Sequence, residues 1–256
     1  MKVGFIGAGS IGGAMIKGLI NSGVDPEDVL VKGGHSNRAQ ELQKELQFNL
    51  ITNYDELKVT DIIIVAVGSP ALDGVFSELK KIVKDQPVVS VSGGSTIEFM
   101  HNYLPNYSVA LAIPNTPVSI GEGVTGISYA EEFTQEQRDI VKSVFEKMGQ
   151  LIEVPESQLG IFGTVAGCSP AFIDVLIEAL SDAGVLNGLP RQLSYDAVIQ
   201  MLIGSAKLAQ QHNGHVAELK DQVTSPGGST IRGVAALEEN GFRNALIKAV
   251  DAAQNG

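Results

Sequence analysis

A glycine-rich turn near the start of the chain constrains its fold more than any other feature. Gly7-Ala8-Gly9-Ser10-Ile11-Gly12 follows a short β-rich run (residues 2–6) and opens a stretch of helical periodicity (residues 12–22). In that context, G-x-G-x-x-G predicts a tight turn at Gly7, a close backbone approach to a pyrophosphate at Gly9, and close helix–strand packing at Gly12. The helix N-terminus would supply N–H donors and a positive dipole end. The alternative is a purely structural turn.

The rest of the first half alternates strand and helix signals. The clearest strand is residues 61–67, because an uninterrupted β-branched run is typical of a parallel strand covered on both faces. Further strands are predicted at residues 29–32, 50–52, 87–91, 108–113, 126–128 and 151–154, with helices at 38–48, 70–83 and 134–148. This rhythm predicts an α/β fold with a Rossmann-type, doubly wound sheet.

The rhythm ends near Pro155. Residues 169–183, 192–212 and 230–253 have helical patterns rich in Ala, Leu and Ile. We therefore predict two domains: an NADP-binding Rossmann domain over residues 1–155 and an all-α domain over residues 156–256. Because the helices are apolar on more than one face, the second domain should bury part of its surface against another subunit.

Charge and composition exclude several classes of function. The net charge of -11 argues against a nucleic-acid partner, which needs a broad basic surface. The only cysteine, Cys168, permits no internal disulfide and suits a reducing compartment. The strand-like run at Lys2 leaves no room for a signal peptide, and no apolar stretch approaches the roughly 20 residues of a membrane helix. We expect a cytoplasmic protein without a membrane partner. His212 and His215 lack a third ligand, so no metal site is expected.

The end of the second strand bears on the choice of cofactor. An NAD site usually places Asp or Glu there to bind the ribose 2′-hydroxyl. Residues 29–38 contain no acid. Instead, a 2′-phosphate would find candidate partners in Lys32, His35, Ser36, Asn37 and Arg38. The pattern favours NADP(H), with NADPH preferred over NADH. The alternative is that Lys32 and Arg38 are solvated loop and helix-start charges.

Several further segments resemble the pyrroline-5-carboxylate reductase family, and the resemblance runs over essentially the whole chain. Its most specific part is Leu219-Lys220-Asp221-Gln222-Val223-Thr224-Ser225-Pro226-Gly227-Gly228-Ser229-Thr230, continuing to Glu238. Pro114-Asn115-Thr116-Pro117, residues 121–123, residues 178–184 and residues 188–191 also match. The resemblance implies reduction of the C=N bond of 1-pyrroline-5-carboxylate to L-proline with NAD(P)H, the last step of proline biosynthesis. It also implies a homodimer or a larger assembly of dimers.

The resemblance assigns roles to particular residues. Gly227, Gly228 and Ser229 open a helix whose N–H groups would bind the substrate carboxylate, and Thr230 would hydrogen-bond or protonate the imine nitrogen. The alternative is that Ser229 or Thr230 only caps the helix. The active site is expected between the glycine turn and this loop, with different subunits as possible contributors. The cofactor contacts expected from the motif are Gly7, Ala8, Gly9, Ser10, Ile11 and Gly12, and those expected after the second strand are Ser36, Asn37 and Arg38. To these the resemblance adds Asn53, Ala66, Val67 and Asn115. These last four could equally be ordinary turn or core residues.

The chain also departs from the family pattern. Gly68-Ser69-Pro70 stands where Lys-Pro is usual, Leu111 where a basic residue is usual, and Ala166-Gly167-Cys168-Ser169-Pro170-Ala171 where Ser-Gly-Ser-Gly-Pro-Ala is usual. Two alternatives therefore stay open: a diverged paralogue acting on another cyclic imine, and a non-catalytic NADP-binding regulator. The intact loop 227–230 argues against the regulator. A β-hydroxyacid dehydrogenase would need a helix-borne lysine, and residues 159–189 contain no Lys or His.

Overall fold

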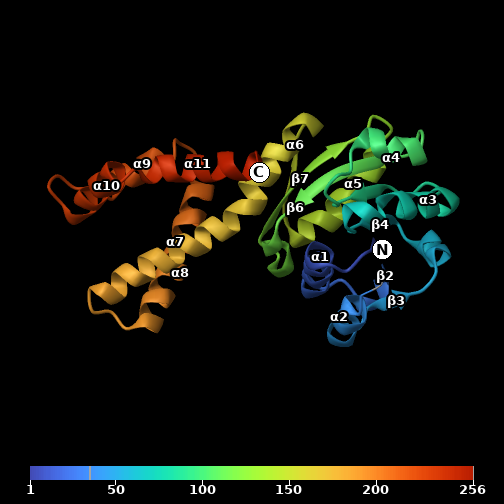
Figure 1. The fold of residues 1–256 in the computed structure, drawn as a ribbon, viewed down its shortest axis with the longest axis horizontal. Helices are drawn as coiled ribbons and strands as arrows, with labels where there is room; N and C mark the ends of the chain where they lie inside the picture. The colour runs from blue at the N-terminus through green and yellow to red at the C-terminus, as the bar shows by residue number, and fades with distance from the viewer. Residues whose placement is uncertain (35, 256) are drawn as a thin grey trace. The chain divides into compact units, whose positions relative to one another are not determined.

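The computed structural model describes residues 1–34 and 36–255 (Figure 1). His35, a sequence candidate for binding a 2′-phosphate, lies outside the described residues. The chain divides into two compact units, residues 1–167 and residues 168–256. The boundary near residue 155 stays a prediction, and the two units are described separately below.

The first unit is built on one eight-stranded sheet with the strand order β3-β2-β1-β4-β5-β6-β7-β8. The strands are β1 Val3–Ile6, β2 Val29–Lys32, β3 Asn49–Ile51, β4 Ile62–Val65, β5 Val88–Ser90, β6 Val109–Pro114, β7 Gly123–Tyr129 and β8 Gly149–Glu153. All neighbouring pairs are parallel except β6 and β7. Only a short 3-10 helix, Thr116–Ile120, joins these two, whereas a parallel crossover needs a dozen or more residues.

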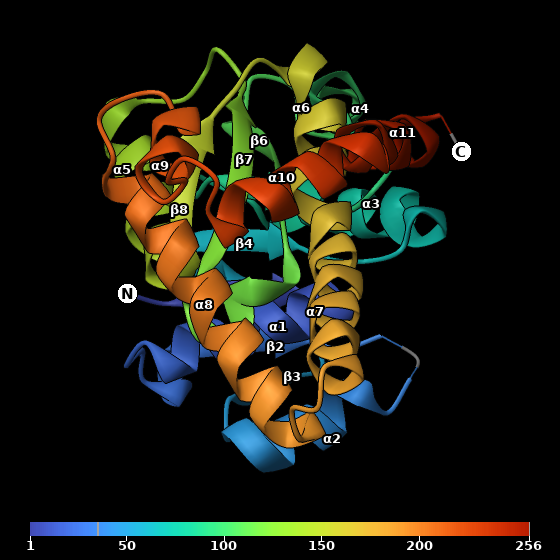
Figure 2. The same cartoon turned by 90° about the vertical axis from the view of Figure 1, so that its left-hand side faces the viewer.

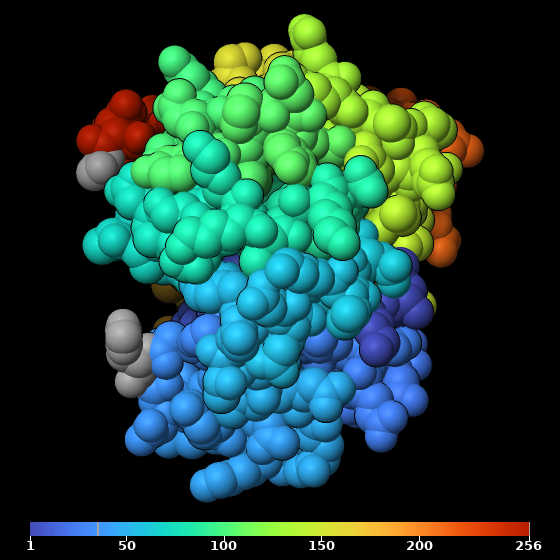
Figure 3. Space-filling model, turned by 90° about the vertical axis from the view of Figure 1, so that its right-hand side faces the viewer, coloured from blue at the N-terminus to red at the C-terminus, as the bar shows by residue number. Residues whose placement is uncertain are grey.

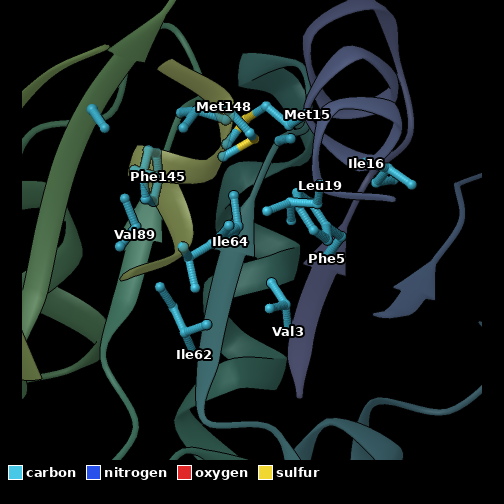
Figure 4. Close-up of a cluster of buried hydrophobic side chains, with 14 of the residues drawn as sticks. Val3, Phe5, Met15, Ile16, Leu19, Ile62, Ile64, Val89, Phe145 and Met148 are labelled. Atoms are coloured by element: carbon cyan, nitrogen blue, oxygen red, sulfur yellow. The ribbon is translucent and has the colours of Figure 1, made fainter. Parts of the chain in front are cut away.

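Helices cover both faces of this sheet. They are α1 Ser10–Asn21, α2 Arg38–Leu46, α3 Leu72–Ile82, α4 Ile97–Tyr103, α5 Gln135–Phe145 and α6 Glu156–Gly163. Along β4, Ile62 and Ile64 belong to one buried cluster, shown in Figure 4, and Ile63 and Val65 to the other. All four side chains are fully buried. The unbroken apolar run of β4 is therefore explained by two packed faces.

Each face has its own packing partners. Met15, Leu19 and Phe145, from α1 and α5, pack over Ile62 and Ile64 in the first cluster. Phe76 and Leu79, from α3, belong to the second cluster. Figure 3 shows the outer surface of this unit, where the β2–β3 segment (blue) and the α3–α4 segment (cyan to green) are exposed. The sheet edge that carries the carboxyl ends of β1, β2 and β4 is thereby held rigidly.

The second unit is helical, which confirms the predicted fold class of a Rossmann-type sheet followed by an all-α domain. A π-helix, Thr164–Cys168, leads into α7 Ser169–Leu186, α8 Arg191–Gln211, α9 Ala217–Gln222, α10 Ser229–Glu239 and α11 Phe242–Gln254. The prediction of one helix over residues 230–253 is wrong. Gly241 adopts φ +73°, a left-handed conformation that separates α10 from α11.

Helices α7 and α8 form an antiparallel pair (Figures 1 and 2). Ser181 and Ser194 are fully buried where these helices meet, and the Ser194 hydroxyl donates to the Ser181 carbonyl oxygen at 3.0 Å. Arg191 Nη1 donates to Ser181 Oγ at 2.9 Å. A Cβ on Gly184 would lie 2.2 Å from Ser194 Oγ, so glycine is what permits this close approach.

The second unit has no apolar core of its own. Among its described residues only Ser181 and Ser194 are buried. Large apolar side chains are instead exposed along the helices, including Val175, Leu186, Leu193, Leu208 and Ile247. A surface of this kind requires a covering partner.

One sequence expectation about hydropathy is wrong. Residues 156–186 run through α6, the π-helix and α7, and this stretch is long and apolar enough to cross a membrane by length and composition. Gly163, Gly167 and Pro170 interrupt the apolar pattern of this run, although residues 157–173 carry no charged side chain. A helix covered by a second subunit meets the same test. The second half of the run carries Asp174, Glu178 and Asp182.

Candidate functional site

The three motif glycines have the geometry that a dinucleotide turn requires. Gly7 adopts φ +101°, and a Cβ there would lie 2.3 Å from the Ala66 carbonyl oxygen. A Cβ on Gly12 would lie 2.6 Å from the Gly7 oxygen, so α1 packs directly against the turn. A Cβ on Gly9 would meet no atom within 4 Å. The turn is therefore tightly packed on its inner side and open at Gly9, where a pyrophosphate would approach.

The start of α1 supplies the donors for such an anion. Gly9 is its N-cap and provides no side-chain cap. The first helical hydrogen bond runs from the Gly13 N–H to the Gly9 oxygen, 2.8 Å. The N–H groups of Ser10, Ile11 and Gly12 precede it and have no intrahelical partner. Together with the helix dipole they attract a negative group in a protein whose net charge is -11.

A cavity of about 450 Å³ opens at the carboxyl ends of β1, β2 and β4. Strand order reverses between β1 and β4, which is where open α/β sheets bind ligands. Lining residues include Gly7, Lys32, Tyr54, Val67 and Pro70. The cavity is continuous with the inner side of the glycine turn and has the location of an adenosine site.

Lys32 and Tyr54 form the polar wall of this cavity. Lys32 Nζ lies 5.6 Å from the centre of the Tyr54 ring and donates to the Gly33 carbonyl oxygen at 3.2 Å. Burial, together with the negative charge of Glu78, raises the pKa of Tyr54. Sequence reasoning named Lys32 and missed Tyr54. The available signal was a tyrosine directly after Asn53, at the end of the third predicted strand.

Arg38 lies beside the glycine turn. A depression of about 290 Å³ is lined by Ala8, Gly9 and Arg38, together with Gly13, Glu41, Leu42 and Glu45. Arg38 is the first residue of α2, and Asn37, preceded by Ser36, is the N-cap. The fold thus brings Arg38 to the turn, whereas Ser36 and Asn37 are not among the residues that line this depression. Two acids share the depression, of which Glu45 is paired with Lys17 at 3.2 Å.

The two asparagines with expected cofactor contacts both hold loops. Asn53 Oδ1 accepts from the Asp55 N–H at 2.9 Å and caps a short helix. Asn115 Oδ1 accepts from the Val124 N–H at 2.9 Å, and its Nδ2 donates to the Ala166 oxygen at 3.0 Å. Both side chains are therefore engaged by the backbone, as their turn-residue interpretation predicts. Any contact with a cofactor would use their remaining hydrogen-bonding capacity.

The strand-end residues and the departures lie close together in the fold. Ala66 is almost fully buried, and the Val67 N–H donates to Ser92 Oγ at 3.0 Å. Ser69 Oγ donates to the Gly93 oxygen at 2.6 Å, which ties the loops after β4 and β5 together. Leu111 is buried in the core of β6. The departures thus replace basic residues with an internally bonded Ser69 in the loop after β4 and with the buried strand residue Leu111.

In the second unit, the Ser225–Gly228 loop is a tight turn. The Gly228 N–H donates to the Ser225 oxygen at 3.0 Å, and Gly227 adopts φ +68°. A proline at the second position and a left-handed glycine at the third position of a four-residue turn are typical of a type II turn. The Gly228 N–H, expected to face the substrate, is therefore used within the loop.

Helix α10 begins directly after this turn. Its N-cap is Gly228, and no side chain caps it. Ser229 and Thr230 are thus the first two helical residues, and neither acts as the N-cap. The N–H groups of the first turn, from Ser229 to Ile231, have no intrahelical partner and form the anion-binding end of the helix.

These features define a two-unit chain with a Rossmann-type sheet and a helical unit in which no side chain caps the start of α10. Within residues 1–34 and 36–255, no group of three or more His, Cys, Asp or Glu side chains has the arrangement of a metal site. Residues 156–256 match the family model described as pyrroline-5-carboxylate reductase dimerisation. Residues 2–94 match the model described as NADP oxidoreductase coenzyme F420-dependent.

Full-length relatives are more specific. A pyrroline-5-carboxylate reductase from Synechocystis is 36% identical, covering 99% of this chain and 96% of the relative. The Escherichia coli enzyme of that name is 36% identical, covering 97% of this chain and 94% of the relative. Among solved structures, the Plasmodium falciparum pyrroline carboxylate reductase with NADP bound has a TM-score of 0.87 and 31% identity, covering 100% of this chain and 96% of that chain. The chain belongs to the pyrroline-5-carboxylate reductase family.

Proposed function

We propose that this protein is an NAD(P)H-dependent reductase that converts 1-pyrroline-5-carboxylate to L-proline. One observation carries the proposal. A chain that belongs to this family has both a glycine turn open at Gly9 and a helix that begins at Ser229 without a side-chain cap. The first is shaped for a dinucleotide and the second for a carboxylate. A cyclic imine acid needs both, and the family match favours it over other carboxylate substrates.

Each end of the reaction has candidate residues. A bound nicotinamide would supply the hydride for the imine carbon, and with a proton on the imine nitrogen the product would be the secondary amine of proline. The N–H groups at the start of α10 hold the substrate carboxylate, with Gly227 and Gly228 shaping the turn. The Thr230 hydroxyl hydrogen-bonds the imine nitrogen and helps to deliver its proton. No further proton donor is needed, because the imine that is protonated with the help of Thr230 is electrophilic enough to accept the hydride.

The proposal is tested with purified protein, NADPH and pyrroline-5-carboxylate. Oxidation of NADPH is followed at 340 nm, and the product is separated from its enantiomer by chiral chromatography. We expect L-proline in a 1:1 ratio to NADPH consumed. Tight NADPH binding without turnover would support a regulator instead. Faster turnover of another cyclic imine would support a diverged paralogue.

We further propose that NADPH is preferred over NADH. Support comes from the absence of an acid in residues 29–38, from Lys32 in the 450 Å³ cavity, and from Arg38 beside the glycine turn. The two basic residues line separate hollows, and Glu41 and Glu45 share the one beside Arg38. No acid follows β2 within residues 29–38 to bind a ribose hydroxyl. A charge-assisted hydrogen bond contributes about 1.5–3 kcal/mol, so losing one should weaken NADPH use by about tenfold or more.

The cofactor preference is tested by comparing kcat/KM for NADPH and NADH in Lys32→Gln and Arg38→Gln variants. Each should lower the NADPH/NADH ratio, mainly through the NADPH value. Lys44→Gln is the matched control, because Lys44 is an exposed cation in the last turn of α2. A wild-type preference for NADH, or ratios unchanged in both variants, would contradict the proposal.

We also propose a cytoplasmic homodimer, or a larger assembly of dimers, formed through the helical unit. The support is the exposed apolar surface of α7, α8, α10 and α11, together with the dimerisation family model over residues 156–256. The single cysteine suits a reducing compartment. Light scattering should give at least twice the 27.0 kDa chain mass. A stable, fully active monomer would contradict this.

A further inference from the structure

Arg232 contacts the loop that precedes α10. Its side chain is exposed one turn into the helix, and Nη1 donates to the Gly227 carbonyl oxygen at 2.6 Å. Other arginines of this unit are neutralised by carboxylates, Arg191 by Asp182 and Arg243 by Glu238. In the described part of the chain, no carboxylate forms an ion pair with Arg232. Its positive charge is thus uncompensated in a protein with a net charge of -11.

The contact fixes a single peptide group. The carbonyl of the Gly227–Gly228 peptide is held by Arg232, and the N–H of the same peptide is held by the Ser225 oxygen at 3.0 Å. This peptide connects a left-handed glycine, which is otherwise flexible, to the first turn of α10. With both of its polar groups bound, the peptide orients the following N–H groups of the helix start before any ligand arrives.

The guanidinium also retains most of its hydrogen-bonding capacity. Arginine has five N–H donors in a planar fork suited to carboxylates, and one of them is used here. Arg232 follows Ser229 by three residues in α10, and its guanidinium reaches back to the Gly227 carbonyl, just before the start of that helix. A carboxylate bound at that helix start would therefore feel both the helix dipole and a nearby guanidinium.

We propose that Arg232 is a positioning and specificity-determining residue for the substrate carboxylate. It orients the 227–228 peptide and adds positive charge where the carboxylate binds, so it selects cyclic imines that carry an acid over those that do not. This inference rests on the proposed function of the 225–230 loop. It concerns a residue that the sequence analysis did not single out.

The test compares two substrates in the same variants: pyrroline-5-carboxylate and 1-pyrroline, the same ring without the carboxylate. Arg232→Gln keeps a donor for the Gly227 carbonyl and removes the charge, whereas Arg232→Lys keeps the charge. For pyrroline-5-carboxylate we expect Arg232→Gln to raise KM about tenfold, the loss of about one charge-assisted hydrogen bond, with kcat little changed. Arg232→Lys should recover much of this loss. The kcat/KM for 1-pyrroline should stay within about twofold in both variants.

Inhibition by cyclopentanecarboxylate provides a second measurement that needs no turnover of 1-pyrroline. Its Ki should rise about tenfold in Arg232→Gln, while the Kd for NADPH stays the same. The control is Arg243→Gln, an exposed arginine paired with Glu238 in the same unit, which should change neither value. The KM for pyrroline-5-carboxylate should also rise with ionic strength more steeply in wild type than in Arg232→Gln.

The outcomes separate this inference from the proposed function. A wild-type protein that does not reduce pyrroline-5-carboxylate overturns the proposed function. An active wild type whose KM and Ki are unchanged in Arg232→Gln overturns the role of Arg232 and leaves the function standing. Equal losses with both substrates, or losses not recovered by lysine, mean that Arg232 only maintains the loop, which overturns the specificity claim.

Discussion

Replacing Gly12 or Gly9 by alanine should have different effects. Gly12→Ala should lower the stability of the fold, whereas Gly9→Ala should weaken cofactor binding. At Gly12, a Cβ would lie 2.6 Å from the Gly7 oxygen and 3.0 Å from the Ala66 Cβ, and both are atoms that cannot swing aside. Overpacking of this kind costs about 1–3 kcal/mol. For a unit of 167 residues, each kcal/mol shifts the midpoint by about 2–4 °C. Gly12→Ala should therefore lower Tm by roughly 2–12 °C.

The same substitution at Gly9 should instead weaken cofactor binding. Gly9 has φ -72° and ψ -160°, which alanine adopts without strain, and its Cβ would meet no protein atom within 4 Å. A compatible Gly→Ala change stabilises by about 0.4–1 kcal/mol, but Gly9 is the N-cap of α1, where alanine is disfavoured by a similar amount, so Tm should change little. The methyl group would instead occupy the space that the pyrophosphate needs. Losing one charge-assisted hydrogen bond of about 1.5–3 kcal/mol would weaken NADPH binding about 10- to 100-fold.

The assay pairs thermal unfolding, followed by far-UV circular dichroism, with the Kd for NADPH from its own fluorescence enhancement. Gly9→Ala should leave Tm nearly unchanged and lose affinity. A drop in Tm for Gly9→Ala as large as that for Gly12→Ala would refute the assignment of the open and packed sides of the turn. So would an unchanged NADPH affinity in Gly9→Ala.

Three further predictions follow from individual contacts. Thr230→Ala should lower kcat/KM for imine reduction at least about tenfold without changing the Kd for NADPH, and Thr230→Ser should retain most activity; a loss under about twofold in Thr230→Ala argues against a proton-delivery role. Gly184→Ala would place its Cβ 2.2 Å from Ser194 Oγ, so urea unfolding should show a loss of about 1–3 kcal/mol, and adding Ser194→Ala should recover part of it. Burial and the charge of Glu153 raise the pKa of Tyr129 to about 12, so its contribution to stability is present below its unfolded value near 10 and is lost as pH rises toward 12. The free energy of unfolding of Tyr129→Phe should therefore fall less steeply with pH than that of wild type between those pH values. Parallel stability–pH curves for the two proteins would contradict the assignment.

Local patterns were enough to predict the sheet. The strand at residues 29–32 was predicted with the bounds of β2, and the apolar run of 61–67 contains β4. Periodicity works here because both faces of β4 are packed, which excludes polar residues. The short helices α4 and α6 were missed because too few turns are present to establish a period of 3.6 residues. The break at Gly241 was missed because a glycine within an amphipathic pattern is tolerated as often as it is a stop.

The site was predicted less completely than the fold. The glycine turn was predictable because Gly7 and Gly12 are required by close contacts with residues nearby in the chain or directly after the neighbouring strand β4. Arg232 was not predictable, since it acts across a loop whose conformation the sequence does not specify. Tyr54 left one weak signal, its place directly after Asn53. The engagement of the Gly228 N–H by Ser225 likewise depends on the turn type, which becomes clear only from the φ of Gly227.

The most direct test of the account is a side-by-side measurement of kcat/KM, with NADPH, for pyrroline-5-carboxylate and for its six-membered ring homologue. The account predicts that the five-membered imine acid is the better substrate and that the product is L-proline. A preference for the six-membered ring, or NADPH binding with no turnover of either imine, would contradict it.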